Sequence, residues 1–214
     1  MPAKWQQTFA REAHLLNTHR GWDPGALEFA RFLAKHTKAP LHATQWTRLL
    51  CDCNRDADNA KVWSSIGSKL DASAKQQILE AFHQPYRQAV QQELASMLAR
   101  GESVFHLSLH SFTPKRNGVV RPCELGIMYD SRIAEEKQLA KALQQHLSMV
   151  DAHFRVRLNY PYVGRSTYFQ PALRKQFAAP QYLALQIEVN QKIPRQQKAR
   201  WQRLQRALLE FLRG

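Results

Sequence analysis

The chain has 214 residues, of which 44% are hydrophobic and 22% are charged. This composition is ordinary for a globular protein, and it excludes the disordered and fibrous classes. Its 31 Lys and Arg residues against 17 Asp and Glu residues give a net charge of +14, which would attract polyanions or small anionic substrates. We find neither an apolar run of the roughly 20 residues that span a bilayer nor the pattern of a signal peptide.

The three cysteines are Cys51, Cys53 and Cys123. Their number is odd, and Cys-x-Cys is a poor zinc signature because usual ligand pairs have two or more residues between them. We therefore expect the cysteines to be ordinary packing residues in a reduced, cytoplasmic setting.

Helical patterns dominate the first half of the chain. Asp23 and Pro24 precede an apolar pattern at helical spacing over residues 26–34, which predicts a helix with Asp23 as its N-cap. Residues 41–53 mix short apolar runs with polar residues and suggest a strand with its exit loop. Residues 73–99 predict a long helix, kinked at Pro85.

The second half alternates between strand and helix patterns. Residues 104–110 place Phe105, Leu107 and Leu109 on one face of a predicted strand. A loop at 114–122 is longer than a hairpin needs, so it could line a site. Further strands are predicted at 124–129, 155–158 and 182–189, and helices at 133–150 and around Trp201, Leu204, Leu208 and Phe211.

Such alternation predicts an α/β sandwich with a mixed, mostly parallel sheet. We expect a single domain over residues 1–214, because the sequence contains no repeat, low-complexity tract or linker. In open α/β sheets ligands collect at the carboxyl ends of strands. The polar residues that follow the predicted strands are therefore the candidates for a site.

Two of these candidates could bind a metal. His110 ends a predicted strand, where an imidazole could be a metal ligand, but a capping or surface histidine fits the same position. His106 lies deeper on the same face, and a structural role suits it better. Asp23 could be a carboxylate ligand, although helix capping alone explains the residue types around it.

The other candidates could bind an anion or move a proton. Arg48, Asn54 and Arg55 could hold a carboxylate by charge-assisted hydrogen bonds, or could be solvated charges beside a turn. Glu188 lies inside an apolar strand, and a buried charge requires a partner or a function. It could be a general base beside a metal-bound water, or it could form an ion pair with one of the arginines.

Six blocks of the sequence, taken together, resemble the N-formylglutamate amidohydrolase family, particularly its predicted branch. They occur in the order of the family and are spread over most of the chain. The blocks are HRGWDPGA (19–26), RLLCDCNR (48–55), HLSLHSFTP (106–114), ELGIMYD (124–130), NYPYVG (159–164) and IEVNQ (187–191).

The resemblance implies a three-layer α/β fold with a mixed central sheet, like that of zinc-dependent exopeptidases and of phosphorylase/hydrolase-like proteins. It also implies zinc, or another divalent metal, held by two histidines and one acidic residue. His110 matches the second histidine of this set and Asp23 matches its acidic ligand, while Glu188 resembles the general base.

The same resemblance implies substrate-binding residues. Asn54 and Arg55 are similar to the Asn-Arg pair that binds a substrate carboxylate, with Arg48 as an assisting residue. Asn159 and Tyr162 would line the pocket.

The chain departs from the family at its start. Family members begin with a strand that ends in a Glu-His segment, whereas this sequence opens at Met1 beyond that segment. We expect the first metal-binding histidine to lie upstream of a misassigned start; the alternative is that the protein lost it. A catalytic zinc site with only Asp23 and His110 is one ligand short of three.

The sequence thus predicts metal-dependent hydrolysis of an N-formyl or N-acyl amino acid, such as N-formylglutamate. The expected partner is a small carboxylate-bearing substrate, without nucleic acid or membrane. One alternative is a non-catalytic relative that binds an anion without a complete metal site. Another is a basic nucleic-acid-binding protein, motivated by the net charge of +14 and tested by salt-dependent binding.

Overall fold

The computed structural model describes residues 1–165 and 168–214 of the chain. It divides into two compact units. The helical unit comprises Met1–Trp22, His42–Glu102 and Thr167–Gln176, and the sheet unit comprises Asp23–Leu41, Ser103–Ser166 and Phe177–Gly214. The single domain expected over residues 1–214 stays a prediction.

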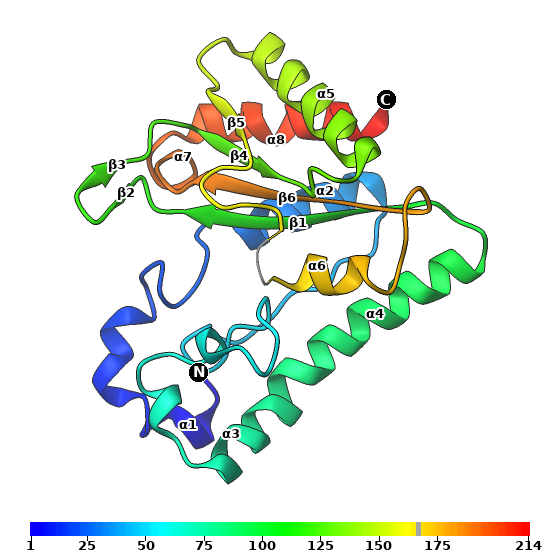
Figure 1. Ribbon diagram of the computed structural model, residues 1–214. Helices are drawn as coiled ribbons and strands as arrows, with labels where there is room; N and C mark the ends of the chain where they lie inside the picture. Colours follow the sequence, from blue (N-terminus) through cyan, green and yellow to red (C-terminus); the bar gives the residue numbers. More distant parts are fainter. Residues whose placement is uncertain (166–167) are drawn as a thin grey trace. The chain divides into compact units, whose positions relative to one another are not determined.

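A four-stranded mixed sheet organises the sheet unit (Figure 1). Its strand order is β1-β6-β4-β5, and β6 runs parallel to β1 but antiparallel to β4, which in turn is parallel to β5. The predicted mixed, mostly parallel sheet is confirmed. The strands span Val104–Phe112 (β1), Leu125–Met128 (β4), Val156–Leu158 (β5) and Tyr182–Asn190 (β6).

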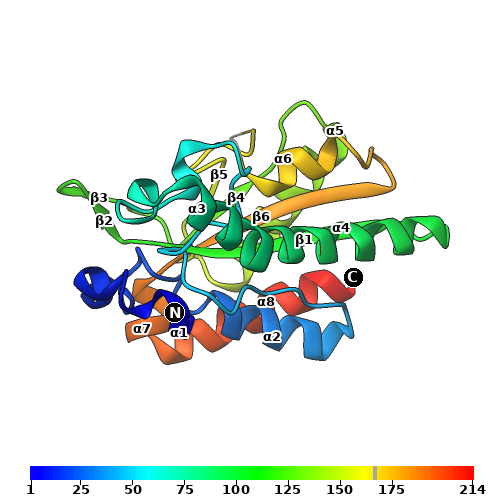
Figure 2. The same cartoon turned by 90° about the horizontal axis from the view of Figure 1, so that it is seen from below.

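Three helices cover one face of this sheet. They are α2 (Ala26–Thr37), α5 (Ala134–Val150) and α8 (Lys198–Arg213), and α2 and α8 lie side by side in Figure 2. Alternate residues of β6, Leu185 and Ile187 among them, join Phe29 and Trp201 in the core between sheet and helices. Because the apolar residues of the strands face these helices, the polar residues between them lie on the opposite face. A mixed sheet flanked by helices is the fold that the sequence predicts. The expected arrangement in three layers stays a prediction.

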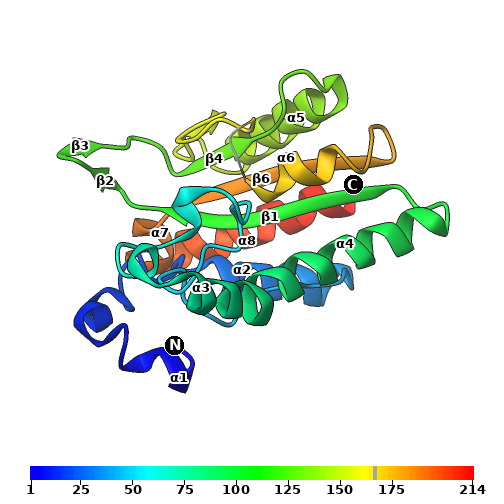
Figure 3. The same ribbon diagram turned by 60° about the horizontal axis from the view of Figure 1, so that its bottom comes forward.

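A small hairpin and a short helix complete the sheet unit. The hairpin pairs β2 (Lys115–Arg116) with β3 (Val119–Val120), and Figure 3 shows it beyond the end of β1. Its turn residues Asn117 and Gly118 have φ of 49° and 82°, as two-residue hairpin turns require. The predicted 114–122 loop therefore contains this hairpin. Helix α7 (Lys192–Gln196) links β6 to α8.

In the helical unit, a long helical segment is the main feature (Figure 3). The predicted helix over 73–99 is confirmed as α3 (Ala72–Ile78), a π-helical turn (Leu79–His83) and α4 (Gln84–Ala99). The π-helical turn ends two residues before Pro85, whose ring disrupts the regular hydrogen-bond ladder. The remaining elements are α1 (Ala3–Gln6), η1 (Ala10–Leu15), η2 (Ala60–Val62), η3 (Gly67–Lys69) and α6 (Phe169–Arg174).

The strand expected within residues 41–53 is wrong. The segment consists of turns and irregular backbone, although Leu49 and Leu50 are buried in the core of the helical unit. Its backbone is tied locally, for example by the Asp52 amide to the Val62 carbonyl at 2.8 Å. The apolar run therefore reflects burial of a loop rather than strand pairing.

All three cysteines are free and buried. Cys51 and Cys53 pack in the core of the helical unit. This is the packing role that the sequence predicts for them.

No helix among residues 1–165 and 168–214 has the length and apolar character needed to cross a bilayer.

Candidate functional site

The parallel pair β1 and β6 brings two predicted residues into register. His110 of β1 lies opposite Glu188 of β6, and Gly126 of β4 lies opposite Glu188 on its other side. Neighbouring strands are about 4.8 Å apart, and residues in register point to the same face. His110 and Glu188 therefore share the face opposite α2, α5 and α8.

Asp23 joins His110 directly. The Asp23 carboxylate oxygen Oδ2 is 2.8 Å from Nδ1 of His110, and both side chains are largely buried. Asp23 is not the N-cap of α2, so that expectation is wrong. The N-cap is Gly25, whose φ is 83°, and a Cβ there would lie 2.6 Å from Pro194. With capping left to Gly25, the carboxylate reaches the strand end instead.

Glu188 is buried, with 4% of its surface exposed. The side-chain amide of Gln186, two residues earlier on the same face, donates to Oε1 of Glu188 at 3.1 Å. This hydrogen bond fixes the orientation of the carboxylate. A buried, oriented carboxylate beside a histidine has the geometry of a proton acceptor.

Two sequence blocks of the family pattern pack against each other next to β4. A Cβ at Gly126 would lie 1.7 Å from the Tyr160 carbonyl oxygen, so only glycine permits this approach. Asn159, at φ 49°, accepts hydrogen bonds at Oδ1 from the amides of Tyr129 and Gly164, both at 3.1 Å. Through these bonds Asn159 holds the backbone at Tyr129 and Gly164. Its role in substrate binding stays a prediction.

Tyr162 lies in the same segment. Its ring is 5.7 Å from the guanidinium of Arg121, an arginine whose role the sequence did not suggest. Its predicted place in the substrate pocket is not tested by this contact.

The predicted carboxylate-binding residues Arg48, Asn54 and Arg55 belong to the helical unit. Oδ1 of Asn54 accepts a hydrogen bond from the Phe169 amide at 3.1 Å. The guanidinium of Arg55 stacks 4.2 Å from the ring centre of Tyr168. Its Nε is 3.9 Å from Asp52, a long ion pair.

Arg48 is anchored through its backbone. Its amide donates to the Gly21 carbonyl at 3.1 Å, which ties the Arg48 segment to the segment that precedes Asp23.

The backbone at Arg55 is held by two residues that sequence reasoning missed. Nε2 of His83 is 2.8 Å from the Arg55 carbonyl oxygen, and Arg87 donates to the same oxygen at 3.0 Å. Arg87 also bonds Asp56 at 2.6 Å and stacks on Phe169. The four-residue spacing of His83 and Arg87 on a helical pattern was the available signal.

Burial lowers the pKa of His83, and the nearby charge of Arg87 acts in the same direction, while the hydrogen bond to the Arg55 carbonyl opposes the shift. His83 is 3% exposed, and its Nδ1 has no hydrogen-bond partner among the described residues. The neutral ring with its proton on Nε2 fits this environment.

Metal-ligating side chains must lie close together to share one ion. Within the described parts of the chain, no group of three or more His, Cys, Asp or Glu side chains could hold a metal ion. Asp23 and His110 supply two adjacent donors of the types that zinc prefers. They fit as two ligands of a zinc site, and the described residues do not complete a three-ligand set.

The fold and these residues define an α/β protein with an acid-histidine pair and a buried glutamate on one face of a mixed sheet. The family model for N-formylglutamate amidohydrolase matches residues 1–193. The chain therefore belongs to the N-formylglutamate amidohydrolase family.

The solved structures that are similar to the chain include the following two. The gene product Atu2144 from Agrobacterium tumefaciens is 26% identical, with a TM-score of 0.81 over 100% of this chain and 86% of that chain. An N-formylglutamate amidohydrolase from Ralstonia eutropha JMP134 is 20% identical, with a TM-score of 0.59 over 77% of this chain and 70% of its own. The latter likeness shows the fold alone. No protein of curated function matches the chain.

Proposed function

We propose that the protein is a metal-dependent amidohydrolase that acts on an N-formyl or N-acyl amino acid, with N-formylglutamate as the first substrate to test. The main support is that three predicted site residues lie together in the sheet unit. Asp23, His110 and Glu188 come from three distant sequence blocks, yet Asp23 bonds His110 and Glu188 lies in register with it.

Asp23 and His110 are proposed as two ligands of a divalent metal, zinc in the first instance. Bound there, such an ion would supply Lewis acidity and lower the pKa of water. The described residues supply these two donors, and the remaining ligand of a three-ligand set stays a prediction.

Glu188 is proposed to take a proton from the attacking water and to return it to the leaving amine. Its carboxylate suits both steps because it is buried and because Gln186 holds one oxygen at 3.1 Å. Burial also keeps bulk water away from the carboxylate, which strengthens its interactions with a bound substrate.

Replacing Glu188 with Gln tests this role. The change retains side-chain size and the contact with Gln186, and we expect the kcat for N-formylglutamate hydrolysis to fall roughly 100- to 10,000-fold. Glu210→Gln, at an exposed position of α8, is the matched control and should retain the wild-type rate. Full activity of the Glu188 variant, with metal bound as in the wild type, would exclude the base.

Arg55, with Asn54 and Arg48, is proposed to bind the carboxylate of the substrate. Its support is chemical: a guanidinium stacked on Tyr168 has fewer conformations to lose when it forms a forked pair. Arg55→Lys is expected to raise KM for N-formylglutamate about 10-fold or more. A substrate amide that lacks a carboxylate should show no such change, and an equal change for both substrates would contradict the role.

A further inference from the structure

The sheet unit contains a pocket that none of the predicted site residues lines. It has a volume of about 380 Å³ and lies where β6 ends and where β4 and β5 begin, within the size range of small-molecule sites. Neither Asp23 nor His110 nor Glu188 lines it. Its charged lining consists of four cations, Arg121, Arg155, Lys192 and Arg200, and one carboxylate, Glu124.

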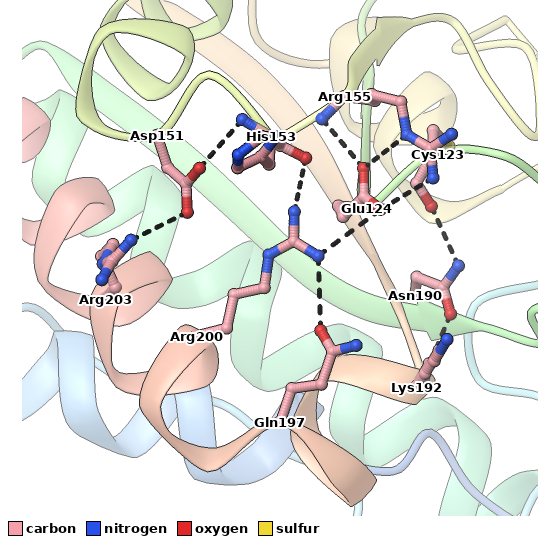
Figure 4. A network of polar contacts seen from close by, with 10 residues as sticks. All are labelled: Cys123, Glu124, Asp151, His153, Arg155, Asn190, Lys192, Gln197, Arg200 and Arg203. Atoms are coloured by element: carbon pink, nitrogen blue, oxygen red, sulfur yellow. Dashed lines mark hydrogen bonds and ion pairs between the residues drawn. The ribbon is translucent and has the colours of Figure 1, made fainter.

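Glu124 already forms an ion pair with Arg155 (Figure 4). The guanidinium of Arg155 donates to both carboxylate oxygens of Glu124, at 3.1 and 3.0 Å, and the Arg155 amide adds a third bond at 2.9 Å. The burial of Glu124 acts to raise its pKa, but the hydrogen bonds and charge of Arg155 outweigh it, so the pKa is lowered. The single carboxylate of the pocket is therefore ionised and neutralised by one arginine.

Among the described residues, Arg200 shares the carboxylate of Glu124 with Arg155. Its Nη1 is 3.7 Å from the same Glu124 oxygen that Arg155 bonds. Its other bonds go to neutral oxygens, the side chain of Gln197 at 3.4 Å and the backbone carbonyl of His153. Figure 4 shows Arg200 between these groups. Arg155 and Arg200 thus share one carboxylate in the pocket, which leaves an excess of positive charge there.

Arg121 is the most deeply buried cation of the pocket. Only 9% of the residue is exposed, yet its described contacts are two long hydrogen bonds to Thr113 and the rings of Phe112 and Tyr162. Burying a guanidinium away from a carboxylate is unfavourable. The neighbouring Lys192 is exposed and adds a further charge to the pocket.

We propose that this pocket binds a small dianionic oxyanion, either a phosphate group or a dicarboxylate. Four cations against one carboxylate leave three positive charges, which a dianion neutralises better than a monoanion. Guanidinium groups form forked hydrogen bonds with phosphate and carboxylate oxygens alike. The cations surround a hollow rather than forming a stripe, so the geometry favours a small ion over a nucleic-acid backbone.

Isothermal titration calorimetry with inorganic phosphate tests the proposal, at constant ionic strength maintained with chloride. Lys192→Gln and Arg200→Gln should each weaken phosphate binding roughly 10-fold. Lys198→Gln removes an exposed cation of α8 that does not line the pocket, and it should leave the affinity unchanged. A parallel titration with succinate decides between the phosphate and the dicarboxylate.

His110→Asn separates this pocket from the proposed hydrolytic site. The variant should bind phosphate as the wild type does, even if hydrolysis is absent in both. No binding of either dianion, an equal loss in the Lys198 variant, or a loss confined to the His110 variant would each overturn the proposal.

Discussion

At the scale of the residue, His83 shows how a side chain outside the candidate site can fix the backbone within it. Its ring and the guanidinium of Arg87 hold one carbonyl oxygen, that of Arg55. The ring accomplishes this while neutral and buried, with a lowered pKa. Protonation is therefore linked to unfolding of this part of the chain.

The linkage predicts a pH dependence of stability. The unfolded histidine has a pKa of about 6.5, and the folded value is lower, so below about pH 6.5 the unfolded state binds the extra proton. The free energy of unfolding should fall as the pH drops below 6.5 and level off once the folded pKa is passed. Urea denaturation from pH 7.5 to 5 measures this trend.

His83→Gln should remove that part of the pH dependence, while His36→Gln, at an exposed position of α2, should preserve it. The same slope in the wild type and in the His83 variant would contradict the assignment.

Single residues were predicted from sequence with mixed success, for a physical reason. The strand pattern placed His110 and Glu188 correctly on strands because alternation fixes a face. The link from Asp23 to His110 joins residues far apart in sequence, and local pattern alone favoured capping. His83 and Arg87 were missed because the partner they share is the backbone carbonyl of Arg55, and their four-residue spacing alone does not identify that partner.

At the scale of the element, most strands and helices follow from periodicity, and the failures have a common cause. Residues 41–53 carry buried apolar side chains, but within the described chain they pair with no strand. Their apolar pattern, which results from burial of a loop, was therefore mistaken for that of a strand. Around β4, by contrast, close backbone packing explains why a family block contains glycine. Gly126 is needed because the Tyr160 backbone occupies the space of a side chain.

Gly126→Ala is expected to destabilise the protein by at least about 1–3 kcal/mol, because the added methyl meets backbone that cannot move without disturbing the sheet. Gly67→Ala is the control, since its Cβ would make ordinary contacts no closer than 3.4 Å. The control should change the free energy of unfolding by less than about 1 kcal/mol. Equal unfolding midpoints for the two variants in urea would contradict the close packing at Gly126.

At the scale of the whole molecule, the net charge of +14 needs an explanation that the fold alone does not give. The basic pocket of the sheet unit gathers four of these cations around one carboxylate. If the pocket binds a small anion as proposed, that function accounts for part of the net charge. The cytoplasmic setting and the absence of a nucleic-acid partner stay predictions.

Nucleic-acid binding is therefore expected to be weak and unspecific. Fluorescence anisotropy with short DNA and RNA should show binding only at low salt, with the affinity lost between about 50 and 200 mM salt. Binding that persists at 200 mM salt and discriminates between sequences would favour the nucleic-acid alternative.

The most direct measurement is elemental analysis of the purified protein and of its Asp23→Asn and His110→Asn variants. If Asp23 and His110 are metal ligands, a wild-type protein that also supplies the predicted third ligand should carry about one divalent ion per chain, with zinc the first candidate, and both variants should lose it. A wild-type protein that hydrolyses N-formylglutamate without metal, or variants that retain the ion in full, would contradict the metal-dependent amidohydrolase.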